Sequence, residues 1–206
     1  MQNPRNDSPV KRAATLVLSM LLAIGATFAI AGCSAANDEQ VIRDGITAQL
    51  DMFKNPTKES LEPLMAEVDP SKLELFESYG IDFYEFFEHA FGKFDYKVGD
   101  IKVDGNTAVA DVTVTSINVD SVIADVSDKA KNDKKISAEI QKIAESGDQA
   151  KVMQYVIGLI YDSMDATTDV VTTDMKIKLV KEGNAWDFDK DSLAELTSSI
   201  YSSVAQ

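Results

Sequence analysis

The fold is decided by residues 94–115, FDYKVGDIKVDGNTAVADVTVT, where the apolar residues change from helical spacing to alternation. Apolar residues at every second position are typical of a β-strand with one buried face. The pair Asp104-Gly105 favours a tight turn between two such strands. The segment therefore predicts a β-hairpin, whose return strand has an apolar face (Ala108, Ala110, Val112 and Val114) and a polar face (Asp111, Thr113 and Thr115).

A second hairpin is expected towards the C-terminus. Its first strand presents spaced apolar residues on one face (Val171, Met175, Ile177 and Leu179). Gly183-Asn184 supplies the turn, and Trp186 and Phe188 lie on the returning strand.

The residues before the first hairpin have helical spacing. One helix is predicted from the stripe Ile42, Ile46, Leu50 and Phe53, with a capping box at Asn37 and Gln40 and an end at Asn55-Pro56. Shorter helices are expected after the N-caps Ser60, Asp69 and Asp82, with Pro63 in the first turn after Ser60 and stops at Gly80 and Gly92.

Between the hairpins, residues 120–168 are predicted to form a helical insert. Three apolar stripes with helical spacing support it (Val122, Ile123 and Val126; Ile136, Ile140 and Ile143; Val152, Tyr155, Val156, Leu159 and Ile160). A last helix is expected after Ser192, with Glu195 completing its capping box. The fold class is therefore α+β: N-terminal helices packed on a curved antiparallel sheet of about four strands, a helical insert and a C-terminal helix.

The stretch VKEGNAWDF, Val180 to Phe188, carries a family resemblance. With the helices before the strands, it resembles the NTF2-like (cystatin-like, cone-shaped) domains found in many Gram-positive lipoproteins of unknown function. The likeness covers residues 38–120 and 170–189, and it implies a concave pocket. The helical insert departs from the family pattern, so the pocket could be open or plugged.

The N-terminal segment has the features of a secretion signal. Lys11 and Arg12 precede an uncharged apolar run from Ala13 to Gly32, and Ile30-Ala31-Gly32-Cys33 resembles the lipobox of bacterial lipoproteins. The resemblance implies cleavage before Cys33, whose sulfur then carries a diacylglyceryl group. Two acyl chains hold a protein stably at a membrane, whereas one chain holds it only marginally.

The alternative is an uncleaved membrane anchor, because an uncharged run of about 20 residues is just long enough to span a bilayer. Small and polar residues dilute its second half, which favours the signal. The expected organisation is a signal peptide over residues 1–32, a lipidated tether over 33–37 and one α+β domain over 38–206.

Charge and cysteine content limit the function. The chain has 206 residues and a net charge of −14, and residues 1–32 carry +2 (three basic residues and one acidic), which leaves −16 from Cys33 onward. This charge argues against nucleic acid as a partner and against a basic patch that binds lipid headgroups. Cys33 is the only cysteine, so the domain has no disulfide and depends on its core.

Two features have a catalytic or metal-binding interpretation and a plainer one. His89, the only histidine, could act as a base in a pocket, but it lies on the polar side of a helix near Glu85, as a surface histidine would. Asp187, Asp189 and Asp191 resemble the start of a calcium loop, yet the later positions that need glycine and glutamate hold Ser192 and Ser198. A helix start explains this acidic run more simply.

Two groups of side chains could bind something. Eight aromatic residues between positions 79 and 96 would line a pocket or fill the core between helices and sheet. Lys129, Lys131, Lys134 and Lys135 form a basic run that is either a solvated face or a dock for an acidic partner or cell-wall polymer.

The sequence thus predicts a non-enzymatic, membrane-anchored extracytoplasmic lipoprotein of a Gram-positive-type cell, which binds a ligand or partner. No catalytic residue, cofactor or metal ligand is assigned, and Cys33 is the one site residue. The alternatives are a pocket enzyme or carrier for a small apolar molecule, and a structural envelope protein. A filled core with an apolar stripe exposed on the helix at 148–166 would favour the partner.

Overall fold

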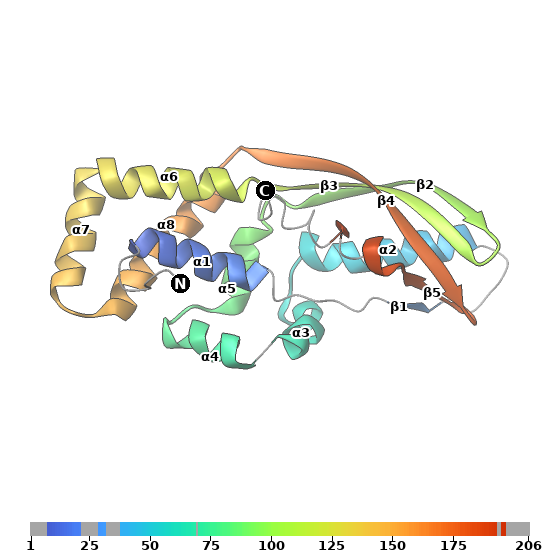
Figure 1. Ribbon diagram of the computed structural model, residues 1–206, viewed down its shortest axis with the longest axis horizontal. Coiled ribbons are helices and arrows are strands. Elements are labelled where there is room, and N and C mark those ends of the chain that lie inside the picture. The colour runs from blue at the N-terminus through green and yellow to red at the C-terminus, as the bar shows by residue number, and fades with distance from the viewer. Residues whose placement is uncertain (1–7, 22–28, 32–37, 69, 193–194, 197–206) are drawn as a thin grey trace.

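A computed structural model describes residues 8–21, 29–31, 38–68, 70–192 and 195–196. The molecule is elongated, with an antiparallel sheet at one end and a group of helices at the other (Figure 1). The α+β class predicted from the sequence is confirmed.

The sheet has five strands in the order β1-β5-β4-β3-β2, and every neighbouring pair is antiparallel. Both predicted hairpins are present, and Gly105 and Gly183 have positive φ angles of 59° and 65° in their turns. The strands are β1 (Ala29–Ala31), β2 (Asp95–Asp104), β3 (Thr107–Ile117), β4 (Val170–Glu182) and β5 (Ala185–Phe188).

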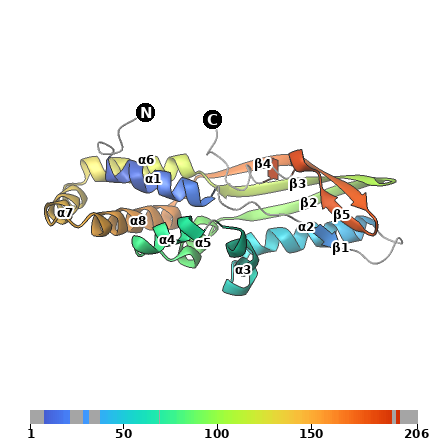
Figure 2. The ribbon, with the colours of Figure 1, turned by 60° about the horizontal axis from the view of Figure 1, so that its bottom comes forward.

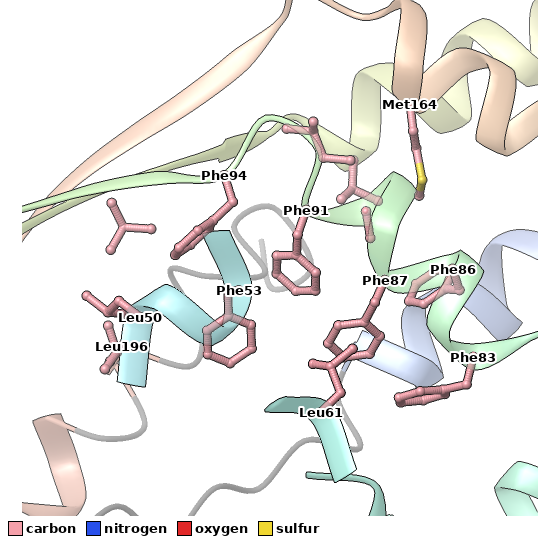
Figure 3. Packing of buried hydrophobic residues seen from close by; sticks show 14 of the residues in the cluster. Leu50, Phe53, Leu61, Phe83, Phe86, Phe87, Phe91, Phe94, Met164 and Leu196 are labelled. Carbon is pink, nitrogen blue, oxygen red and sulfur yellow. The ribbon is translucent and has the colours of Figure 1, made fainter. Parts of the chain in front are cut away.

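Helix α2 (Asp38–Lys54) covers the apolar face of the sheet (Figure 2). Its four predicted core residues, Ile42, Ile46, Leu50 and Phe53, are all at most 1% exposed. The Phe53 ring lies 5.2 Å from that of Phe91 and 5.8 Å from that of Phe94 (Figure 3). The face on which the family resemblance places a pocket is therefore packed against α2.

Three short helices follow, α3 (Lys58–Glu67), α4 (Pro70–Ser78) and α5 (Phe83–Ala90). Asp82 caps α5 as predicted, since its carboxylate accepts hydrogen bonds from the amides of Tyr84 (2.8 Å) and Glu85 (3.3 Å). The predicted cap of α3 is wrong. Thr57 is the N-cap and Ser60 completes its capping box, which places Pro63 in the middle of the helix. The hydroxyl of Thr57 and that of Ser60 can each cap a helix, and capping at Thr57 lets α3 begin nearly one turn earlier.

The insert consists of α6 (Val119–Asn132), α7 (Lys134–Glu145) and α8 (Gln149–Ala166). It continues outward from β3 and returns to β4, so it extends the molecule along its long axis (Figure 1). At its base, the Asn118 amide donates to the Asp169 carbonyl (3.0 Å), and the Ser121 hydroxyl donates to the Asp169 carboxylate.

Two elements lie in the segment predicted to be the signal peptide. Helix α1 (Pro9–Leu21) packs against α6 and α8, and β1 pairs with β5, which makes the sheet one strand wider than expected. Val10, Ala13 and Leu16 of α1 are buried.

The start of the last helix also differs from the prediction. The chain is helical from residue 190, and the Asp189 carboxylate accepts a hydrogen bond from the Asp191 amide (3.1 Å). Ser192, the predicted cap, is instead buried inside the helix and accepts a hydrogen bond from the Lys178 amide of β4 (2.9 Å).

Candidate functional site

Cys33 lies outside the described residues, and the next described segment begins five residues later, at Asp38. Asp38 begins α2 beside the ends of β4 and β5, at the sheet end of the molecule (Figure 1). A chain extends by at most about 3.5 Å per residue, so five residues from Cys33 to Asp38 span no more than roughly 17 Å. The end of the sheet therefore lies close to Cys33.

Asp38 is held in place by two side chains of the sheet. Its carboxylate accepts hydrogen bonds from the Lys181 ammonium (2.8 Å) and the Trp186 indole (3.3 Å). The ammonium also lies 5.3 Å from the centre of the Trp186 ring. The bond from Lys181 lowers the pKa of Asp38, although partial burial opposes this effect. The start of α2, five residues after Cys33, is thus fixed to β4 and β5.

At the opposite end lies α7, an amphipathic helix with an incompletely covered apolar face (Figure 1). Ile136, Ile140 and Ile143 lie on one side of it, and none of its residues is buried. By contrast, α6 and α8 bury three and eight residues. The predicted stripe at 136–143 is therefore present, but the rest of the described domain only half covers it.

A shallow groove of about 570 Å³ joins α7 to α8 on this end of the molecule. It is lined by Ile143 of α7 and by Tyr155, Gly158, Leu159 and Asp162 of α8. Tyr155 and Leu159 are half-buried, whereas the residues on the other side of α8, such as Val156 and Ile160, are fully buried. The stripe predicted on 148–166 thus divides into a core face and a partly exposed face.

The tip of the insert carries a net positive charge, although the protein as a whole is acidic. Residues 129–151 contain six lysines and four acidic residues, a net charge of +2, while the whole chain carries −14. Three of the lysines form ion pairs with nearby carboxylates: Lys129 with Asp125, Lys142 with Glu139 and Lys151 with Asp148. Lys131, Lys134 and Lys135 are exposed at the junction of α6 and α7.

His89 connects two helices rather than lining a pocket on the sheet. Its Nδ1 lies 2.8 Å from a carboxylate oxygen of Asp165 on α8, and its ring stacks on Tyr161 with 4.3 Å between ring centres. The predicted neighbour Glu85 is not the partner that the structure gives it. His89 is half-buried, and its contacts are those of a residue that holds α5 against α8.

The three aspartates of the calcium-like run have separate tasks. Asp187 lies within β5, and Asp189 caps the helix that contains Asp191. Within the described residues, no group of three histidine, cysteine, aspartate or glutamate residues is placed to hold a metal ion.

The aromatic residues at 79–96 form most of the core between α2, α5 and the strands. Phe83, Phe86, Phe87, Phe91 and Phe94 are each at most 6% exposed, and neighbouring rings lie 4.8–6.1 Å apart. Figure 3 shows these rings turned toward one another. The core interpretation is therefore correct for these five.

A separate cavity of about 380 Å³ lies among α3, α4 and α5. Its wall is mainly apolar, with Met65, Phe76, Ile81 and Phe83, and Glu77 and Asp82 also line it. The Asp82 carboxylate is used as the cap of α5. Phe83 and Tyr84, two of the aromatic residues for which the sequence left a pocket open, line this cavity. Its position was not predictable, because its wall comes from three short helices whose packing is not local.

Among the described helices, none has the length and apolar character needed to cross a bilayer. The comparisons with known proteins give no relative: no family model matches the chain, and no curated protein or solved structure is significantly similar to it.

Proposed function

We propose that this chain is a membrane-anchored extracytoplasmic lipoprotein, attached through Cys33, that binds a partner protein with the tip of its helical insert. The start of α2, which follows Cys33 by five residues, and the tip of the insert lie at opposite ends of the long axis (Figure 1). A domain attached near Asp38 therefore presents α7 away from the membrane. The role is binding, and no catalytic residue is assigned.

The observation that carries the proposal is the half-covered apolar face of α7 and the groove beside it. Apolar surface gathered in one place is costly in water and is typical of an interaction site. Ile143, Tyr155 and Leu159 supply the apolar part of the groove, and Lys151 and Asp162 also line it. The exposed Lys134 and Lys135 lie at the other end of α7. We infer a partner surface that has apolar side chains in its centre and acidic side chains around them.

Photo-crosslinking in intact cells tests this function. A photoreactive residue replaces Tyr155 in the groove, or Ala138 on the exposed opposite side of α7. We expect one discrete crosslinked protein from position 155 and none from position 138. Purified together, the two proteins should bind less tightly as salt concentration rises, because the lysines contribute to the contact.

Two matched variants complete the test. Ile143→Glu places a charge in the groove and should abolish the product from position 155. Ala138→Glu adds the same charge to the opposite side and should leave it intact. A product that survives Ile143→Glu, or equal labelling from both positions, would contradict binding at the tip.

The cavity among α3, α4 and α5 favours a second candidate function, the carriage of a small apolar molecule. Its volume of about 380 Å³ is within the usual range for ligand pockets, about 300–1,000 Å³. The cavity is not on the sheet face that the NTF2-like resemblance implies, so this function would not rest on that resemblance.

A further inference from the structure

Helix α1 completes a three-helix group with α6 and α8. It contacts both helices, which also contact each other (Figure 2). The buried positions of α1, Val10, Ala13 and Leu16, are three residues apart and so form one stripe. Lys11 and Thr15, between them, are exposed. The helix therefore lies on α6 and α8 as an amphipathic helix lies in a groove.

The centre of the stripe is closely packed. Ala13 is 0% exposed, between Val10 at 6% and Leu16 at 9%. A small residue at the centre lets two helices approach closely, and the larger aliphatic residues on either side fill the space beside it. The contacts of α1 are with α8 and α6, and its three buried residues belong to the apolar core that runs through the described domain.

Processing before Cys33 would remove this helix from the fold, since α1 and β1 both precede the cleavage point. The buried side chains of α6 and α8 that α1 covers would then face water. Exposure of apolar side chains to water is unfavourable, so the uncovered surface of α6 and α8 favours binding of any amphipathic helix that can replace α1.

We propose that cleavage opens a helix-binding groove between α6 and α8, and that in the mature protein this groove receives an amphipathic helix of a partner protein. The proposal rests on the proposed function, because it requires processing at Cys33. The partner helix carries a small residue with aliphatic residues three positions before and after it. In α1 this pattern is formed by Val10, Ala13 and Leu16.

The groove is distinct from the one at the tip. On α8, Val156 and Ile160 lie on the core face and are 0% exposed, whereas Tyr155, Gly158 and Asp162 lie on a different face, are half-buried or exposed, and line the tip groove. One partner can therefore bind in the tip groove while a helix occupies the groove between α6 and α8.

A labelled synthetic peptide with the sequence of Pro9–Leu21 is the probe. It is titrated by fluorescence anisotropy against two forms of the protein: the mature protein purified from membranes, and the full chain with Cys33→Ser, which keeps α1. We expect saturable binding to the mature protein and none to the Cys33→Ser chain, in which α1 already fills the groove.

Two peptide variants identify the mode of binding. Ala13→Arg puts a long charged side chain at the closely packed position and should weaken binding at least about tenfold. Thr15→Arg adds the same side chain at an exposed position and should bind like the original peptide. Equal binding of the two variants, or no binding of the original peptide to the mature protein, would overturn the groove.

Light scattering and mass measurement separate the remaining outcomes. A mature protein that is a dimer, and that the peptide converts to a monomer, would show that a second copy covers the groove and would overturn the partner. A native protein that still contains residues 9–21 would instead refute processing, and with it the proposed function, whatever the peptide does.

Discussion

At the scale of single residues, Tyr96 shows how polar groups are matched where α2 meets the sheet. Its hydroxyl donates to the Asp51 carboxylate (2.7 Å) and lies 3.3 Å from the Thr47 carbonyl. Burial, followed by the bond to Asp51, raises the pKa of Tyr96 to about 12. A tyrosine in the unfolded chain has a pKa near 10, so the folded state keeps this proton to higher pH.

The substitution Tyr96→Phe removes this hydrogen bond and is expected to lower the free energy of unfolding by about 1 kcal/mol at pH 7. Because the folded pKa is raised, the stability that Tyr96 contributes is complete below pH 10 and is lost as pH rises from about 10 to about 12. Urea unfolding at pH 7, 10 and 12 should therefore show a gap between wild type and variant that narrows at high pH.

A gap that widened above pH 10 would mean that Tyr96 does not have a raised pKa in the folded state.

At the scale of elements, β5 depends on its neighbours on both sides. It pairs with β4 from Leu179↔Phe188 to Glu182↔Ala185, and with β1 from Ala29↔Asp187 to Ala31↔Ala185. If cleavage removes β1, one edge of β5 loses its backbone partners. The sheet of the mature protein would then end at β5.

Hydrogen exchange should detect this change. Comparing the mature protein with the full Cys33→Ser chain, we expect the β5 amides that bond to β1 to exchange at least roughly tenfold faster in the mature protein. The amide of Ile177, in the part of β4 that pairs with β3 and lies outside the β5 pairing, should keep its protection in both forms. Equal protection of β5 in the two forms would show that something else pairs with its edge.

Which elements could be predicted depends on how local their signals are. The hairpin turns at Gly105 and Gly183, the stripe of α2 and the Asp82 cap are each set by residues close in sequence, and each was predictable. The pairing of β1 with β5 joins residues far apart, and residues 29–31 already had an explanation as part of an apolar signal. Ser192 was mistaken for a cap because its burial depends on β4.

In the candidate site too, features set by neighbouring residues were predictable, and contacts between distant residues were not. The amphipathic pattern of α7 was visible in the sequence, but the groove with α8 depends on how the two helices lie together. Asp165, the partner of His89, is 76 residues away, so no local pattern could indicate it.

At the scale of the whole molecule, we propose different tasks for the two ends: attachment at one and partner binding at the other. The sheet end lies near Cys33 through the contacts of Asp38, and the insert forms the other end, with its basic tip and half-covered α7 (Figure 1). The net charge of −16 from Cys33 onward opposes adhesion to anionic lipids, so attachment would depend on the acyl chains. The proposed attachment to the membrane therefore depends on the chemical state of Cys33.

Intact-mass and N-terminal peptide mass spectrometry of the protein extracted from native membranes tests this most directly. The prediction is a chain that begins at Cys33, carries a diacylglyceryl group on its sulfur and lacks residues 1–32, while a Cys33→Ser chain keeps its N-terminal segment. An N-terminus upstream of Cys33, or a Cys33 with a free thiol, would contradict the account.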